Sequence, residues 1–143
     1  MPAKRPDDLV GRLRSRLMDI PDYNNVEDGV ALGEEVMHEA LQDALEDFNI
    51  ETTPTTYTLK TMPARSILLD YALARVIERL IFVLVHNDQA YVTGGEIMLD
   101  SSRKIQVLQA MRADIYARAS KRAETYKTAQ SINRQLVSGL SIT

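Results

Sequence analysis

The sequence predicts a mainly α protein, a bundle of about four helices with a long projecting C-terminal helix and short extended loops. Apolar residues recur at helical spacing in four separate segments. One of these segments is apolar around nearly its whole circumference, as is typical of a helix buried at the centre of a bundle. The last segment is longer than a compact domain of 143 residues.

Length and composition bound the architecture and the class of function. A chain of 143 residues with 45% hydrophobic and 26% charged residues is expected to form a single helical domain over residues 1–143. The absence of cysteine excludes disulfides, thiolate zinc sites and cysteine nucleophiles. No apolar run is long enough to cross a membrane, and the polar start lacks the apolar core of a signal peptide. We therefore expect a soluble cytoplasmic protein without a membrane partner.

The first two helices are predicted from leucine spacing and from the distribution of acids. Residues 7–18 place Leu9, Leu13 and Leu17 in one stripe. Turn-forming residues follow at 20–25, and Asp28 is a candidate cap for a helix over 29–48. The polar side of this second helix is acidic, with Glu34, Glu35, Glu39, Asp43, Glu46 and Asp47.

The middle of the chain contains the predicted core helix. Residues 52–60 are rich in β-branched residues and contain Pro54, which favours an extended loop or a short edge strand. Pro63 is expected in the first turn of the next helix, with Thr61 as its cap. That helix, over 65–86, is apolar on most sides and is predicted to be buried. Residues 91–99 contain Gly94 and Gly95 and are predicted to form a turn or a small hairpin.

The last predicted helix, residues 103–136, is too long for its own domain. Some 33 residues span about 50 Å, whereas a compact chain of this size is only about 37 Å across. Its apolar stripe also thins after Tyr116 to mostly alanines, so the second half buries little area. We expect residues 117–143 to project and to dock on a partner chain.

Charge is strongly segregated along the chain. Residues 19–51 contain eleven Asp or Glu and no Lys or Arg, while residues 103–143 contain eight Lys or Arg and two Asp or Glu. Two interpretations stay open. Adjacent helices within one chain can neutralise each other, or the acidic face of one copy can meet the basic face of the next, which closes into a ring if the rotation permits.

The candidate catalytic and metal sites are weak. Glu35 and His38 have the spacing of helical di-metal proteins, but such bundles need this pair twice, and the other histidine, His86, lacks an acid three residues earlier. Asp70 and Glu78 are explained as structural ion pairs with the nearby Arg75 and Arg79. We therefore expect no catalytic residue, no metal and no cofactor, and the protein is not expected to be an enzyme.

The basic last helix supports an alternative function. Its eight cations are potential phosphate contacts, which would suit a small helical nucleic-acid-binding or regulatory protein. The low isoelectric point, about 5.4, and the lack of a compact helix-turn-helix pattern argue against sequence-specific DNA binding.

The order of segments resembles the head-tail connector, or neck adaptor, proteins of tailed bacteriophages. The resemblance rests on the helix at 9–17, a turn with Asp and Pro, the acidic helix at 34–48, and a loop with Pro, Thr and Tyr. A buried helix at 67–85 follows, and the passage 91–100 with Tyr91, Gly94 and Gly95 then leads into a long basic helix.

This resemblance implies a virion structural protein, made in the bacterial host cytoplasm and located in the phage neck. It implies a subunit of a homo-oligomeric ring, commonly of twelve copies, that docks beneath the portal protein, binds downstream neck or tail proteins and extends the DNA channel. DNA would pass through without specific binding.

The resemblance also implies that C-terminal segments dock into the portal. The tail at 136–143 could add as a strand to a partner's sheet or could fray. The expected subunit or portal interface comprises Arg118, Lys121, Arg122, Tyr126, Lys127, Arg134, Leu136, Leu140 and Ile142. Acids that line either the channel or a subunit interface are Glu35, Glu39, Asp43, Glu46 and Asp47.

Overall fold

The described part of the chain is entirely helix and loop. The computed structural model describes residues 9–18, 33–51, 53–90 and 95–141, and within these ranges no residue is in a strand. The helices are α1 (Leu9–Met18), α2 (Glu34–Ile50), α3 (Arg65–Ala90) and α4 (Gly95–Ser141). The predicted mainly α fold is confirmed, and residues 53–64 form the expected loop rather than an edge strand.

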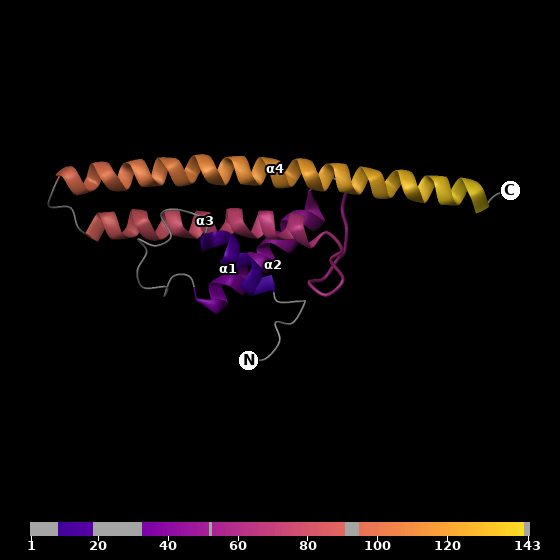
Figure 1. The fold of residues 1–143 in the computed structure, drawn as a ribbon, viewed down its shortest axis with the longest axis horizontal. Helices are drawn as coiled ribbons and strands as arrows, with labels where there is room; N and C mark the ends of the chain where they lie inside the picture. Colours follow the sequence, from indigo (N-terminus) through magenta and orange to yellow (C-terminus); the bar gives the residue numbers. More distant parts are fainter. Residues whose placement is uncertain (1–8, 19–32, 52, 91–94, 142–143) are drawn as a thin grey trace.

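Helix α3 lies at the centre of the fold. α4 runs antiparallel along one side of α3, and α1 and α2 pack on the other side (Figure 1). The first half of α3 is buried nearly all round, and buried side chains of all four helices form one apolar cluster. The stripe of Leu9, Leu13 and Leu17 joins this cluster. Both the central position of α3 and the leucine stripe agree with the sequence patterns.

Helix α4 is longer than the sequence suggests. Its 47 residues span about 70 Å, and its C-terminal end overhangs the start of α3 (Figure 1). Two of the differences from expectation concern its N-terminal end. The helix starts at Gly95 instead of 103, so the turn or hairpin predicted for 91–99 is wrong at 95–99, and 91–94 lie outside the described residues. Residues 96–99 favour a helix and include no proline or glycine, so the helix extends through them.

The tail also differs from expectation. Residues 136–141 continue α4, so neither the added strand nor the frayed end describes this backbone, and residues 142–143 lie outside the described part. A single interior glycine, Gly139, costs a helix only about 1 kcal/mol.

Two predicted helix starts need correction. α2 begins at Glu34 with Gly33 at its N-cap and no side-chain cap, and Asp28 lies outside the described residues. α3 begins at Arg65, after Pro63, and Thr61 does not cap it. The Thr61 hydroxyl instead accepts a hydrogen bond from the Thr58 amide at 2.8 Å, which closes a separate turn. α3 also continues beyond His86 to Ala90, because no Gly or Pro interrupts it.

A buried carboxylate ties three helices together. Asp70 of α3 is only 5% exposed and accepts hydrogen bonds from Arg16 of α1, at 2.5 Å, and from Arg122 of α4. Both guanidinium groups also donate to the Ser66 hydroxyl, one turn earlier on α3. The prediction that Asp70 pairs with Arg75 or Arg79 is therefore wrong in its partners, because these cations come from distant helices.

Replacing Asp70→Asn should lower the free energy of unfolding by about 1 to 3 kcal/mol, since the change leaves two arginines facing a site without a charge. The partial exposure of both arginines keeps the loss below that of a fully buried pair. Urea unfolding followed by circular dichroism measures it. Asp114→Asn, at an exposed site on α4, is the matched control, and equal losses in both variants would refute the role of Asp70.

Candidate functional site

The inner face of α4 is used to hold the fold. Glu51, at the C-cap of α2, accepts hydrogen bonds from the hydroxyls of Tyr71, at 2.5 Å, and of Tyr116. These two rings meet edge to face with centroids 5.5 Å apart. One carboxylate therefore joins the end of α2 to α3 and α4.

Burial, hydrogen bonds and a nearby cation all act on the pKa of this carboxylate. Burial raises the pKa of Glu51, but hydrogen bonds from Tyr116, Tyr71 and Ser120 and the charge of Lys127 outweigh burial and hold the pKa below its ordinary value. Burial and the neighbouring Glu51 raise the pKa of Tyr116 to about 12. Glu51 is thus ionised and both phenols are neutral at pH 7.

Lys127 caps the C-terminus of α2. Its buried ammonium donates hydrogen bonds to the backbone carbonyls of Phe48 and Glu51, the latter at 2.6 Å. It also lies 4.5 Å from the centroid of the Phe48 ring. Burial lowers the pKa of Lys127, and the charge of Glu51 offsets part of that shift. A cation at this end of a helix complements the helix dipole and satisfies free carbonyls.

The loop before α3 fastens α4 one turn further along. Tyr57 donates its hydroxyl hydrogen to Gln130 at 3.2 Å, and Gln130 donates to Tyr126 at 2.9 Å. The Phe48 ring lies between Tyr57 and Tyr126, with centroid distances of 6.1 and 6.4 Å. Asn49 fixes the loop by hydrogen bonds to Tyr57 and Thr55. α4 is therefore held as far as Gln130.

The structure divides the expected interface residues into two groups. Arg122, Tyr126 and Lys127 make the contacts within the chain described above. Exposed side chains lie at Arg118, Lys121, Arg134 and Leu136. Leu140 is within α4 but its side chain is outside the described part, as is Ile142 altogether.

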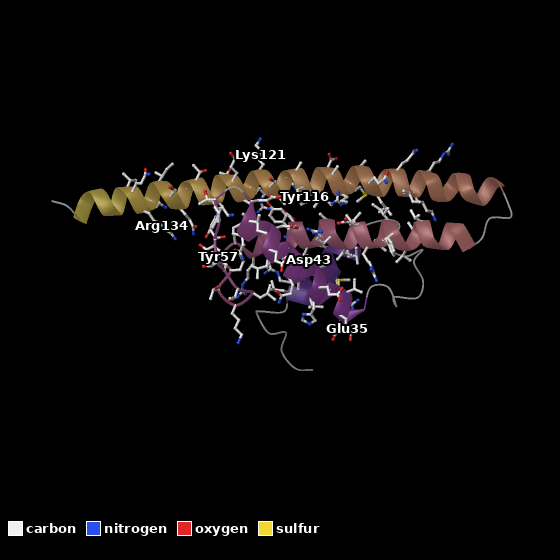
Figure 2. All side chains as sticks on the ribbon, turned by 180° about the vertical axis from the view of Figure 1, so that it is seen from behind. Glu35, Asp43, Tyr57, Tyr116, Lys121 and Arg134 are labelled. Carbon is white, nitrogen blue, oxygen red and sulfur yellow. The ribbon has the colours of Figure 1, made fainter. Side chains whose placement is uncertain are left out.

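The expected acids divide in the same way. Asp47 accepts two hydrogen bonds from Arg75, at 2.7 and 2.9 Å, and so belongs to the fold. Glu35, Glu39, Asp43 and Glu46 are exposed, and none of them forms an ion pair with another described residue. Figure 2 shows Glu35 and Lys121 on opposite sides of the molecule.

The remaining acids and histidines suggested by the sequence concern metal binding and ion pairing. No group of three or more His, Asp or Glu residues that could hold a metal ion occurs among them. Glu78, the second acid of α3, pairs with Arg75 at 3.6 Å and with Arg112 at 3.4 Å, so it acts as a structural ion-pair residue. Pairing with Arg75 agrees with the sequence, whereas Arg112 is a distant partner.

Comparison with known proteins adds no relative. No family model, curated protein or solved structure matches this chain. Among the helices described, none is long and apolar enough to cross a membrane.

Lys127→Met should reduce the free energy of unfolding by about 1 to 2 kcal/mol, because α2 loses the cation at its C-terminus and two carbonyls lose their donor. Lys121→Met, on the exposed side of α4, should change it by less than about 0.5 kcal/mol. Urea titrations of both variants decide the matter. An equal effect at the two positions would mean that Lys127 is not a cap.

The Glu51 site predicts acid sensitivity. Because the pKa of Glu51 is lower in the folded chain than its ordinary value of 4.5, its contribution to stability is present above that value and is lost as the pH falls through the folded pKa. Glu51→Gln should therefore lower stability at pH 7 and flatten the decline below pH 4.5. Unfolding free energies measured from pH 7 to pH 3 test this, with Glu46→Gln as the exposed control whose profile should follow that of the unmodified chain.

Proposed function

We propose that this protein is a structural ring subunit of a phage neck, which docks beneath the portal protein, joins head to tail and extends the DNA channel. The family resemblance suggests a ring of twelve located in the virion. The observation that carries the proposal is the free C-terminal end of α4. Every side chain from residue 131 to residue 136 is exposed, directly after Gln130, which accepts the hydrogen bond from Tyr57 of the loop before α3.

The free end has the chemistry of a docking element. Ile132 and Leu136 are 51% and 61% exposed and stand one turn apart on one side of the helix. Burying each of these two side chains in a partner's groove would contribute about 1.5 to 3 kcal/mol, the usual way in which a helix binds a groove.

The acidic side of α2 suits a channel for DNA. Carboxylates repel phosphates, so a lumen that presents Glu35, Glu39 and Glu46 would let DNA slide without binding it. Three of the eight cations of the last helix, Arg112, Arg122 and Lys127, are bound within the chain. Because these three cations already have partners within the chain, fewer cations of this helix are available for phosphates, which weakens the alternative of a nucleic-acid-binding protein.

The test is assembly on a portal ring. Mixed with the portal of a tailed phage, the protein should form larger particles by light scattering and rings on the portal by negative-stain microscopy. Ile132→Glu with Leu136→Glu should reduce this binding at least tenfold, because two charges replace the apolar contact. Val107→Glu, at another exposed aliphatic position of α4, should leave binding unchanged.

Two outcomes contradict the proposal. A protein that ignores the portal but binds duplex DNA with an affinity that falls steeply with salt would be a regulator instead. Equal binding by the Ile132 and Leu136 variant and by the Val107 variant would show that the free end of α4 does not dock.

A further inference from the structure

Three arginines border one cavity beside the buried Asp70. The cavity, about 410 Å³, lies where α1, α3 and α4 meet, and Arg16, Arg118 and Arg122 line it. Among the described residues of the lining, Asp70 is the one acid, so three guanidinium groups face one carboxylate and two positive charges are left over. The volume falls within the range of small-molecule pockets, about 300 to 1,000 Å³.

Two of the three guanidinium groups are held in place by α3. Arg16 and Arg122 both donate hydrogen bonds to Asp70 and to the Ser66 hydroxyl. A guanidinium group has five N–H donors, and these contacts, together with one from Arg16 to the Ser66 carbonyl, use three donors of Arg16 and two of Arg122. The two side chains are 32% and 43% exposed, so both remain accessible to a ligand.

Arg118 is the cation of this cavity that the fold does not use. It is exposed and forms no ion pair or hydrogen bond with another described residue. It stands one turn before Arg122, so both side chains extend from the same side of α4. Asp114, one turn earlier still, is exposed, is not paired with Arg118 and lies outside the described lining of the cavity. The charge of Arg118 is therefore available to a ligand.

We propose that this cavity binds the terminal phosphate group of a small molecule, either free phosphate or a phosphomonoester. Such a group carries about 1.5 to 2 negative charges at pH 7 and at least three acceptor oxygens, which matches two excess positive charges and three guanidinium groups. Guanidinium groups bind phosphate through paired, charge-assisted hydrogen bonds. A carboxylate ligand carries one charge and would neutralise only half of the excess.

Asp70 does not oppose an anion in this cavity. It is only 5% exposed, and each of its two oxygens accepts a hydrogen bond from an arginine. It therefore presents almost no surface to an incoming phosphate. Its effect is to fix the positions of Arg16 and Arg122 before the ligand arrives, and a site that is already ordered loses less entropy on binding.

The rest of the lining is apolar and suits an organic group attached to the phosphate. Leu73 and Ile115 are each 8% exposed, and Met111 is half-buried. Covering such surface contributes about 25 cal/mol per Å² of apolar area removed from water. The phosphates of a DNA backbone match the cavity less well, because a phosphodiester carries one negative charge and has organic groups on two of its oxygens.

Calorimetric titration of the full chain with inorganic phosphate and with phenyl phosphate, at pH 7.5 and constant ionic strength, tests the site. Arg118→Gln should weaken binding of both ligands at least about tenfold, because one of three charge-assisted contacts is lost. Lys121→Gln is the matched control, since it removes the same charge from an exposed position of α4 outside the described lining. It should bind both ligands like the unmodified chain, and circular dichroism verifies that both variants are folded.

Further ligands identify the source of the phosphate. Tighter binding of phenyl phosphate than of inorganic phosphate identifies a phosphomonoester, whereas equal binding identifies the free ion, and both results support a phosphate site. Benzoate, which has the same ring and a single charge, should bind at least about tenfold more weakly than phenyl phosphate. A DNA duplex without terminal phosphates contains only phosphodiesters and should not displace phenyl phosphate at physiological salt.

Several results would overturn the inference. One is the absence of saturable heat with either phosphate ligand at millimolar concentration. Another is an equal loss of binding in the Arg118 and Lys121 variants, which would indicate general attraction to the charge of α4. Displacement by the DNA duplex, or binding of benzoate as tight as that of phenyl phosphate, would refute the assigned ligand class. The titrations use the chain alone, so their outcome does not depend on whether it assembles on a portal.

Discussion

The fold depends on one buried carboxylate. Asp70 stands on the central helix, and its two oxygens each accept a hydrogen bond from an arginine of a different helix. A carboxylate taken out of water is costly unless its charge is compensated and its lone pairs are filled. Arg16 and Arg122 meet both requirements only when α1 and α4 lie against α3 in one position. The ion pairs therefore specify the arrangement that the apolar cluster stabilises.

A second set of polar contacts determines how far α4 belongs to the subunit. Ala119 and Ala123 let α4 approach closely but bury little area. Lys127 compensates by binding the end of α2, and Tyr57 and Gln130 add the last attachment. Past that point the side chains of residues 131–136 are all exposed, and the proposed docking end begins there.

Periodicity predicts what lies along one helix, and it fails for what joins distant helices. The leucine stripe of α1 and the burial of α3 follow from spacing alone. Sequence could not assign Asp70 to Arg16 and Arg122, because their separations of 54 and 52 residues leave no local signal. Lys127 was expected at an interface for the same reason. Nothing in the local sequence distinguishes a lysine that caps another helix from a lysine that faces water. For Glu51, the only sequence feature that could have indicated its role is its place at the end of the acidic segment.

The continuity of α4 makes the subunit mechanically simple. An uninterrupted helix of 47 residues without proline behaves as a stiff rod. Its attachments to Asp70, Glu51 and the α2 terminus lie near the middle of its length, between its two ends. Force applied at the C-terminal end is therefore carried through these attachments to the opposite end, where α4 runs beside the end of α3 (Figure 1). A displacement of the C-terminal end of α4 would therefore be transmitted to its N-terminal end, because no proline interrupts the helix between them.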